Sequence, residues 1–385
     1  MMFNTELGIF CSVHNNWKEL LSVEPYNLKI KEDGPYVMFS YDQIRSDFNN
    51  PIVREARGII FRTGQWEAPV CWSFNKFFNA QETFADKIDW STAFVSEKVD
   101  GSIVRIWWDW SSGWHISTNG TIDAFKAELN DIKMPTFGHC FENALGKYYS
   151  SFDAFVEDLD FDLTYMFELV GPYNRVVVPY GEPALYFLGA RDKYTGEEFN
   201  CSKLTAGALG MDKFKLPMQF KLDSLESCLE AVETFGWDEE GFVVCDAQFN
   251  RVKIKSPAYV MAHYARNNNV INRKHLIRVI LMNEVEEFLC YAEDYREELE
   301  KIQKLIETFC KVGDAIAVSA RELQTINKGA FAAWVKTLPK IYQDLAFRNY
   351  NYDVSTKDYT SKWSENKWEA CLDNFEKLKE ELFNV

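Results

Sequence analysis

The sequence predicts an α+β fold in two parts: a domain of antiparallel sheets with flanking helices over residues 1–265, and an all-helical domain over residues 266–385. Short runs rich in valine, isoleucine and aromatic residues, separated by glycine, asparagine and aspartate turns, predict the strands of the first domain. After about residue 265 the apolar residues recur at spacings of three and four, which predicts helices. A composition of 47% hydrophobic and 16% aromatic residues is typical of a globular protein with a sizeable core.

The expected strands follow one another between about residues 25 and 260. In chain order their sequences are YVMFSY, GIIFR, SIVRIWW, GWHIS, YMFELV, ALYFLGA, GFVVCD and RVKIKS. Helices are expected near residues 122–132 and 222–235, where the β-like pattern is interrupted. The helical stripes of the second domain are Leu299, Ile302, Leu305, Ile306 and Phe309, then Trp368, Leu372, Phe375, Leu378 and Leu382. We expect Gly313 and Gly329 to end helices there.

Charge and cysteine usage limit the classes of function. A net charge of −16 argues against a broad electrostatic attraction to nucleic acid, so any phosphate contact must come from a local basic cluster. The nine cysteines include no C-x-x-C pair, and the five histidines include no H-E-x-x-H pattern. The first residues do not resemble a signal peptide, and no apolar run is long enough to span a membrane. We therefore expect a cytoplasmic protein with reduced cysteines and no membrane span.

The tetrad Lys-x-Asp-Gly, in which a lysine can become a covalent nucleophile, occurs twice, as KEDG at residues 31–34 and as KVDG at residues 98–101. Asp-Gly between two alternating runs is typical of a hairpin turn, so we expect Lys31 to be a solvated turn lysine. The second copy ends one β-like run and precedes another, where the small Gly101-Ser102 pair lets a ligand approach the backbone. Lys98 is therefore the better candidate for chemistry.

Other charged residues accompany the second tetrad. The stretches that carry them are REARGIIF with Arg57, FELVGPYNR with Glu168, EEGFVV with Glu240, and RVKIKS with Lys253 and Lys255. Lys253 and Lys255 lie two apart on an expected strand, so both side chains point to one face. Two cations there would stabilise charge on a transferring phosphoryl group and disfavour protonation of Lys98. Glu240 is the first choice for a Mg²⁺ contact, because Mg²⁺ prefers carboxylate, phosphate and water oxygens.

In order and spacing, these motifs resemble the covalent nucleotidyltransferase superfamily of ATP-dependent ligases and messenger RNA capping enzymes, and in detail the phage RNA ligase 1 family. EKVDGS resembles the nucleotidyl motif, FELVGPYNRVV the central glutamate motif, EGFVV the next motif and KIKS the last; Arg57-Gly58 and the NKFFN stretch around Lys76 also match. The resemblance covers roughly residues 40–265 and implies a nucleotidyltransferase domain there. One departure is Asn119 before Gly120, where the family commonly has a lysine, so one phosphate or RNA contact is in question.

The resemblance also implies residue roles, with ATP and Mg²⁺ as cofactors and Mn²⁺ as an alternative ion. Lys98 would form a lysyl-AMP adduct, and Asp100 would orient Lys98 or the sugar. Arg57 and Glu168 would bind the ribose, while Lys76 would meet the outer phosphates. The implied catalytic residues are Lys98, Asp100, Lys253 and Lys255, the implied nucleotide-binding residues are Arg57, Lys76, Glu97, Lys98, Glu168, Glu240, Lys253 and Lys255, and the implied metal ligand is Glu240.

The function implied by the resemblance is an ATP-dependent RNA ligase. It would join 5′-phosphate and 3′-hydroxyl ends of single-stranded RNA or nicked tRNA through lysyl-AMP and adenylylated RNA, in RNA repair. We expect a monomer, in the host cytoplasm if the chain is phage-encoded. Two alternatives stay open: a DNA ligase or capping-type enzyme, which usually carries a β-barrel module after the lysine motif, and a non-catalytic nucleotide- or RNA-binding protein.

Two further segments have more than one interpretation. The tryptophan-rich stretch RIWWDWSSGWHIS could stack RNA bases, although four tryptophans in an expected hairpin are more often core. The helical domain opens with the basic segment RNNNVINRKHLIR. That domain could recognise the RNA end or could simply be a stabilising bundle.

Overall fold

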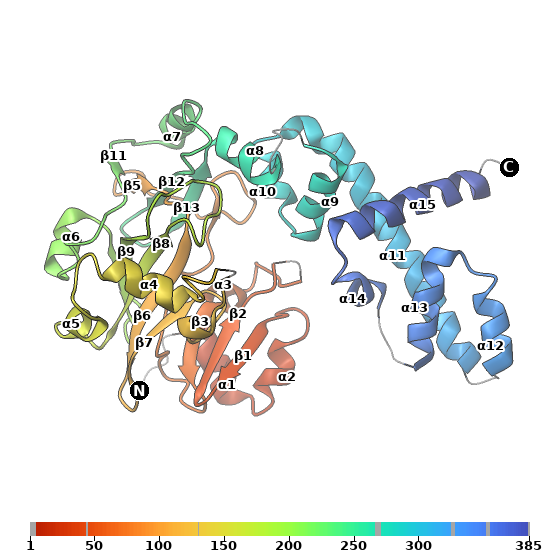
Figure 1. Ribbon diagram of the computed structural model, residues 1–385, viewed down its shortest axis with the longest axis horizontal. Helices are drawn as coiled ribbons and strands as arrows, with labels where there is room; N and C mark the ends of the chain where they lie inside the picture. Colours follow the sequence, from red (N-terminus) through yellow and green to blue (C-terminus); the bar gives the residue numbers. More distant parts are fainter. Residues whose placement is uncertain are drawn as a thin grey trace. The chain divides into compact units, whose positions relative to one another are not determined.

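A computed structural model describes residues 5–43, 45–129, 131–265, 271–324, 328–351 and 355–383. The chain folds into two compact units, Met1–His263 and Tyr264–Val385. All the strands that the structure describes belong to the first unit, and the described elements of the second unit are helices (Figure 1). The predicted α+β class, with antiparallel sheets, flanking helices and a helical C-terminal region, is confirmed.

The N-terminal part of the first unit is a three-stranded antiparallel sheet with the order β1-β2-β3. Its strands are β1 (Lys29–Asp33), β2 (Tyr36–Ser40) and β3 (Arg57–Arg62), and its helices are α1 (Glu6–Val13), α2 (Trp17–Leu21) and α3 (Pro51–Glu55). Apolar residues of the helices and of the sheet, such as Leu7, Leu21, Phe39 and Phe61, form one buried cluster. Helix α3 packs on the sheet two residues before Arg57, the first residue of β3, and so fixes the position of Arg57.

Two five-stranded sheets make up the rest of the first unit (Figure 1). One has the order β10-β9-β8-β6-β7 and is antiparallel; the other has the order β11-β5-β12-β13-β4, in which β13 and β4 are parallel. The strands are β4 (Phe78–Asn79), β5 (Phe94–Glu97), β6 (Ser102–Asp109), β7 (Gly113–Thr118), β8 (Leu163–Val170), β9 (Ala184–Asp192), β10 (Glu198–Asn200), β11 (Gln219–Phe220), β12 (Gly241–Cys245) and β13 (Arg251–Lys255). All eight predicted strand sequences lie in the three sheets. The chain crosses between the two large sheets at residues 98–101.

Each large sheet packs one face against helices. On the first, α4 (Phe137–Leu145), α5 (Phe152–Val156) and α6 (Lys203–Ala208) share a buried cluster with Phe167 and Leu169 of β8. On the second, α7 (Leu225–Val232) packs with Phe242, Val244 and Ile254. Side chains alternate between the faces of a strand, so Glu168, Val243 and Lys253 point to the opposite faces. The helices therefore leave one face of each sheet for the functional residues.

The prediction of a helix near residues 122–132 is wrong. The chain forms only a 3₁₀ turn, η1 (Ala124–Lys126), with the side chain of Asp123 capping it. Residues 127–129 then pair with residues 135–137 through hydrogen bonds from Leu129 N to Pro135 O at 2.7 Å and from Phe137 N to Ala127 O at 2.9 Å. The predicted helix near residues 222–235 is confirmed as α7, which begins with a capping box at Ser224.

The described elements of the second unit begin with α8, a helix that spans the boundary between the two units. They are α8 (Pro257–Ala265), α9 (Arg273–Leu281), α10 (Val285–Leu289), η2 (Glu293–Tyr295), α11 (Arg296–Gln324), α12 (Lys328–Val335), α13 (Lys340–Asn351), α14 (Thr356–Thr360) and α15 (Glu365–Phe383). Neither expected glycine stop is confirmed: Gly313 lies inside α11 and Gly329 in the first turn of α12. At Gly313 an added Cβ would lie 2.4 Å from Oγ1 of Thr356, so glycine there permits close packing of α14.

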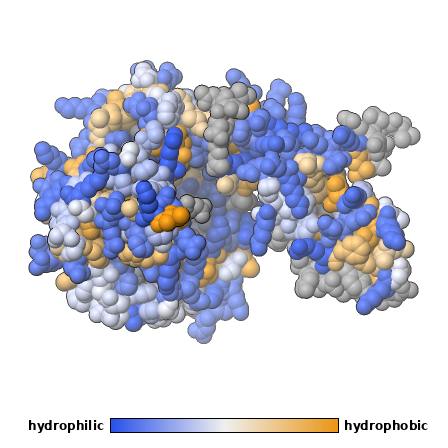
Figure 2. Space-filling view, viewed as in Figure 1, coloured by the Kyte–Doolittle hydropathy of each residue, from blue (hydrophilic) through white to orange (hydrophobic). Residues whose placement is uncertain are grey.

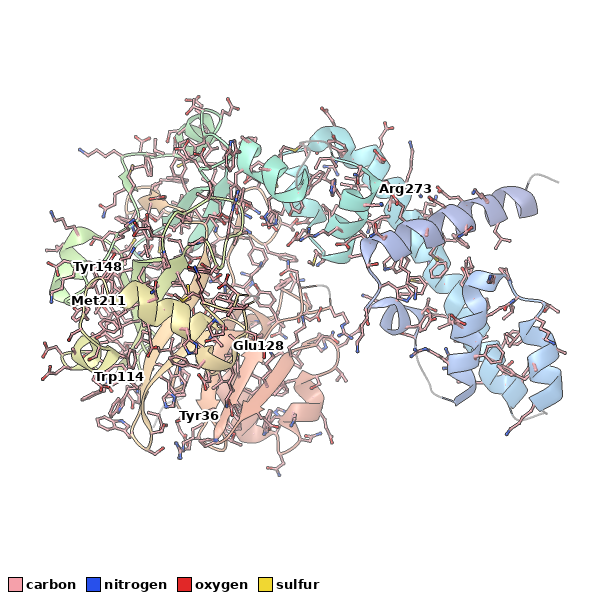
Figure 3. All side chains as sticks on the ribbon, in the orientation of Figure 1. Tyr36, Trp114, Glu128, Tyr148, Met211 and Arg273 are labelled. Atoms are coloured by element: carbon pink, nitrogen blue, oxygen red, sulfur yellow. The ribbon has the colours of Figure 1, made fainter. Side chains whose placement is uncertain are left out.

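Ion pairs join α9 to α15 within the second unit. Arg273, labelled in Figure 3, pairs with Asp373 at 3.2 Å and with Glu376 at 2.7 Å, and Lys274 pairs with Glu369 at 3.4 Å. These cations belong to the basic segment at residues 266–278, of which residues 266–270 lie outside the described part of the chain. In the described part, the segment therefore contributes to helix packing.

Among the described helices, none combines the length and the apolar character that a membrane span needs. In the view of Figure 2, hydrophilic residues dominate the surface, and hydrophobic residues appear in small separate groups. Scattered apolar residues of this kind are normal on a protein surface and need no partner to explain them.

The packing of Gly313 can be tested by Gly313→Ala. Alanine favours a helix by about 1 kcal/mol over glycine, but its Cβ would lie 2.4 Å from Oγ1 and 2.7 Å from Cγ2 of Thr356. We therefore expect a net loss of about 1–3 kcal/mol, measured as a lower denaturant midpoint of the circular dichroism signal. Gly207→Ala in α6 is the matched control, because no atom lies within 4 Å of its added Cβ. An unchanged or higher midpoint for Gly313→Ala would contradict the packing argument.

Candidate active site

A cavity of about 490 Å³ lies in the first unit, a size that is typical of small-molecule sites. Its lining comes from β3, from strands of both large sheets and from the crossover between them. Four of the predicted site residues line it: Arg57, Glu97, Lys98 and Glu168. The sequence segment EKVDGS is thus both the link between the sheets and part of the cavity wall.

Lys98 forms an ion pair with Glu240. Its Nζ lies 2.8 Å from Oε1 of Glu240, and Nζ of Lys255 lies 3.7 Å from the same oxygen. The Glu240 side chain is only 5% exposed, so this carboxylate is buried with two cations beside it. The backbone N–H of Lys98 also donates to the carbonyl of Gly241 at 2.8 Å. Residues far apart in the sequence, at positions 98, 240 and 255, therefore meet at one point.

Glycine is required at position 241 for this close approach. Gly241 has a φ of +135°, and an added Cβ would lie 2.0 Å from the carbonyl oxygen of Ile254 on β13. Only glycine adopts this conformation readily and leaves room for the neighbouring strand. The Glu-Gly pair of EEGFVV thus combines a carboxylate for Lys98 with a backbone that lets β12 and β13 meet at their ends.

Arg57 carries a buried donor without a partner. Among the described residues, no atom accepts a hydrogen bond from its Nη1, although the guanidinium lies over the ring of Phe77 at 4.9 Å. Burial lowers the pKa of Arg57, and the nearby Tyr41 and Glu168 act in the opposite direction. An unsatisfied buried donor is costly, so a polar or anionic ligand in the cavity would stabilise this arrangement.

Glu168 is a neutral acid at moderate pH. Burial raises its pKa from 4.5 to about 8; Lys98 and Arg57 lower it, whereas Glu240 and Asp100 add to the rise. A protonated carboxyl group can both donate and accept hydrogen bonds. It is therefore suited to a ligand with hydroxyl groups.

Lys253 and Lys255 share one face of β13. Val243 on β12 is directly opposite Lys253, and Ser96 on β5 is opposite Val243; both of these neighbours line the cavity. Residues opposite each other in a sheet point to the same side, so Lys253 faces the cavity side of the sheet. The predicted common orientation of the two lysines agrees with this register.

Asp100 occupies a different place from the one expected. Its Oδ2 accepts hydrogen bonds from the N–H groups of Val177 at 2.8 Å and Val178 at 2.7 Å, and its Oδ1 accepts one from the hydroxyl of Tyr259 at 2.8 Å. No described hydrogen bond joins it to Lys98, and it does not line the cavity. Asp100 therefore anchors the crossover to the loop after β8 and to α8.

Two other predicted nucleotide-binding residues are held by protein groups. Nζ of Lys76 lies 5.1 Å from the ring centroid of Phe78, 5.3 Å from Tyr41 and 5.5 Å from Phe48, outside the lining of the cavity. The carboxylate of Glu97 accepts a hydrogen bond from the N–H of Met218 at 3.1 Å. The contacts of Lys76 with Tyr41 and Phe48 and of Glu97 with Met218 were not predictable from the sequence, since these partners are distant in the chain.

Lys31 of the first tetrad lies in strand β1, where it pairs with Met38, and not in the turn. The turn itself uses Gly34, which has a φ of +57°. Nζ of Lys31 donates to the carbonyl oxygen of Gly120 at 2.5 Å. Gly120 and Asn119 line the cavity. The tetrad forms the expected hairpin turn and Lys31 is exposed as expected, but Lys31 itself lies in β1, and its side chain reaches the turn after β7.

Several cavity residues were not predicted. Ser102 and Arg251 line the cavity, and Arg251 pairs with the buried Glu198 at 2.8 Å. Asn174 donates from Nδ2 to Leu169 O at 2.6 Å and to Ser102 Oγ at 3.3 Å. The sequence could have identified Arg251, because it lies two residues before Lys253 and hence on the same face of β13.

The tryptophan-rich segment forms the predicted hairpin of β6 and β7, away from the cavity lining. Trp107 is fully buried, whereas Trp110 is 68% exposed. Trp108 and Trp114 pack with Phe161 at ring-centroid distances of 4.6 and 5.7 Å. The neighbouring Lys193 lies in the field of four aspartates, at positions 109, 160, 162 and 192. Packing and acidic surroundings favour the core interpretation over RNA stacking.

The carboxylates of the site suit a divalent ion only in part. Within the described residues, no group of three or more histidine, cysteine, aspartate or glutamate side chains could hold a metal ion. Mg²⁺ often binds through one or two carboxylates together with water and the phosphates of a substrate. Glu240 supplies one buried carboxylate for such an ion, and in this structure that carboxylate is paired with the ammonium groups of Lys98 and Lys255.

Comparison with known proteins gives matches along most of the chain. The sequence profile of a family described as RNA ligase, of the phage T4 RNA ligase 1 type, matches residues 55–259. A putative bifunctional polynucleotide kinase/RNA ligase of Autographa californica nuclear polyhedrosis virus is 29% identical over 342 residues, covering 84% of this chain and 47% of that protein. An RNA ligase of Rhodothermus phage RM378 is 25% identical over 341 residues, covering 74% of this chain and 76% of that protein. The chain thus spans about half the length of the viral relative.

Solved structures give more distant similarities. An archaeal ATP-dependent RNA ligase aligns with a TM-score of 0.48 at 14% identity, covering 77% of each chain. A Naegleria gruberi RNA ligase with PPi aligns with a TM-score of 0.35 at 15% identity, covering 46% of this chain and 52% of that one.

The raised pKa of Glu168 predicts a pH-dependent stability. In the folded protein the pKa is about 8 and its ordinary value is 4.5, so the stability that comes from keeping this acid protonated is lost as the pH rises from about 5 to 8. Glu168→Gln does not titrate. The melting temperature of Glu168→Gln, measured relative to the wild type, should therefore rise as the pH rises through this range, by on the order of 5 °C.

Thermal unfolding at about pH 5 and about pH 9, followed by circular dichroism, measures this difference. Glu230→Gln, on the exposed side of α7, is the matched control and should show no such gain. An equal effect of Glu168→Gln at both pH values would contradict the assignment of a buried neutral acid.

Proposed function

Because the chain belongs to the RNA ligase family, with a match that covers more than half of its length, we propose that it is an ATP-dependent RNA ligase that forms a lysyl-AMP intermediate on Lys98. The observation that carries the proposal is the meeting of Lys98, Glu240 and Lys255 beside a cavity that contains an unpaired Arg57 donor. A nucleophile, a phosphate-binding cation and a vacant hydrogen-bond donor in one place suit attack on a nucleotide phosphate.

In the first step, Nζ of Lys98 attacks the α-phosphorus of ATP. The new P–N bond forms as the bond from phosphorus to the pyrophosphate oxygen breaks, and the lysine loses its proton. An ammonium group has no lone pair, so Lys98 must lose a proton to water and leave its ion pair with Glu240 before it attacks. Entry of a divalent ion at Glu240 would release the lysine, and the ion would supply charge neutralisation for the departing pyrophosphate.

The remaining cavity residues would bind the nucleotide. Nη1 of Arg57 has no protein partner and would donate to the ribose, together with the protonated carboxyl of Glu168. Lys253 and Lys255 share the face of β13 on the cavity side of the sheet and would stabilise charge on the phosphates. Asp100 would act indirectly by holding the crossover that carries Lys98.

Two further transfers would complete ligation. AMP passes from Lys98 to the 5′-phosphate of RNA, forming a pyrophosphate linkage; a 3′-hydroxyl then attacks that phosphate and AMP departs. We propose single-stranded RNA or a nicked tRNA loop as the substrate, a monomer as the active form, Mg²⁺ as the metal with Mn²⁺ as an alternative, and RNA repair in the host cytoplasm as the role. The family match favours RNA over the DNA-ligase and capping alternatives.

For the helical unit we propose a supporting role for α9. Its Arg273 and Lys274 are neutralised by carboxylates of α15 and would have to break these pairs to bind RNA phosphates. RNA contacts from this unit would therefore come from other residues.

RNA joining tests the proposed activity directly. Purified protein with ATP and Mg²⁺ should convert a 5′-phosphorylated single-stranded RNA into a circular or joined product that resists phosphatase. The same RNA with a 5′-hydroxyl should not react. If the phosphorylated RNA stays linear while the protein carries AMP, the RNA-ligase assignment fails although the nucleotidyl transfer stands.

Lys255→Ala should slow lysyl-AMP formation by about 100-fold or more, because it removes a cation from the site of phosphoryl transfer. The rate is measured in a single turnover with ATP by following the mass of the protein. Lys203→Ala at the exposed start of α6, outside the cavity lining, removes the same charge and serves as the matched control. Equal rates for Lys255→Ala and the wild type would remove Lys255 from the catalytic set.

A further inference from the structure

The turn that follows β7 forms part of the cavity wall. Thr118, Asn119 and Gly120 line the cavity, as does Arg57. A hydrogen bond from Thr118 N to Thr121 O at 3.0 Å closes the turn. Because the turn is a wall of the nucleotide cavity, its position affects how the nucleotide fits.

Three successive carbonyl oxygens of this turn accept hydrogen bonds from side chains of three other strands. The pairs are Arg105 of β6 with Thr118, Ser40 of β2 with Asn119 at 3.4 Å, and Lys31 of β1 with Gly120 at 2.5 Å. The turn is therefore held from outside the cavity by donors that do not themselves line it.

Lys31 is the one member of this set that is charged and exposed, whereas Arg105 is fully buried. A hydrogen bond from an ammonium group is stronger than a neutral one. A second contact joins the same two segments, since Asp33 of β1 pairs with Lys126 of η1 at 2.5 Å. Lys31 and Asp33 of the first tetrad thus both bind the segment that follows β7.

The turn is in close contact with the backbone next to Arg57. An added Cβ on Gly58 would lie 2.9 Å from Asn119 O and 2.6 Å from Nη1 of Arg105. Gly58 has a φ of +76°, and its lack of a side chain lets the turn pack directly on β3. A shift of the turn would therefore change the space beside Arg57.

We propose that Lys31 is a positioning residue for the nucleotide: its bond to Gly120 fixes the turn at residues 118–120 as a wall of the cavity. The inference rests on the proposed function, since the nucleotide is the ATP of lysyl-AMP formation. Lys31 acts through the turn and takes no part in the chemistry. Its loss should weaken ATP binding and leave the maximal rate of lysyl-AMP formation nearly unchanged.

The test compares Lys31→Met, which keeps the stem but removes the ammonium, with Lys31→Arg, which keeps a charged donor. Lys29→Met is the matched control, because Lys29 lies on the same face of β1 and pairs with Asp42 at 3.2 Å instead of with the turn. We expect the KM for ATP to rise about 3- to 10-fold in Lys31→Met, with the maximal rate within about twofold of the wild type. Lys31→Arg and Lys29→Met should retain the wild-type KM.

Amide hydrogen exchange supplies a second measurement that does not need activity. The peptide containing Asn119 and Gly120 should exchange faster in Lys31→Met than in the wild type and Lys29→Met. A wild-type KM in Lys31→Met, an equal rise in Lys29→Met, or a fall in melting temperature without a change in KM would overturn the inference. If the wild type forms no lysyl-AMP, the proposed function fails, and the exchange comparison alone then decides whether Lys31 holds the turn.

Discussion

The buried carboxylate of Glu240 ties together the ends of three strands of one sheet. Lys98 follows β5, Glu240 precedes β12 and Lys255 ends β13, and both lysines lie within ion-pair distance of the same oxygen. Loss of this carboxylate would leave two cations in a largely buried place, which is strongly unfavourable. Glu240 and Gly241 therefore hold the strand ends together at the same point where Lys98 and Lys255 meet.

The crossover that carries Lys98 is fixed at its other end by Asp100. Three hydrogen bonds connect this 4%-exposed carboxylate to Val177, Val178 and Tyr259. Lys98, the proposed nucleophile, thus lies on a segment held on one side by an ion pair and on the other by a buried hydrogen-bond network. Such support keeps a reacting group in a fixed geometry, which lowers the cost of reaching the transition state.

Local patterns predicted most of the fold. Short runs rich in valine, isoleucine and aromatic residues located all eight predicted strands, because such residues favour strands; β2 and β8, for example, are buried along most of their length. The helix prediction for residues 122–132 failed because the buried Ile122 and Ala124 lie at a 3₁₀ turn while Ile132 is fully exposed, so the apolar residues do not form one helical face. The prediction that Gly313 ends a helix failed because this glycine serves packing against Thr356, a contact that the sequence does not reveal.

The site was predictable where a motif carries its own geometry, and not where a distant residue decides the contact. The two-residue spacing of Lys253 and Lys255 was enough to place them on one face of β13. The partners of Asp100, the contacts of Lys76 with Tyr41 and Phe48, and the bond from Lys31 across 89 positions to Gly120 depend on tertiary packing. Lys31 in particular shows that a turn-like sequence context does not fix what an exposed side chain contacts.

The most direct test of the account is the intact mass of the protein after incubation with ATP and Mg²⁺, with Lys98→Arg and Lys29→Met treated in parallel. Pyrophosphate treatment beforehand removes any AMP acquired during expression. The account predicts that the wild type and Lys29→Met gain the mass of one AMP and that Lys98→Arg gains none. An AMP adduct on Lys98→Arg, or no adduct on any of the three proteins, would contradict it.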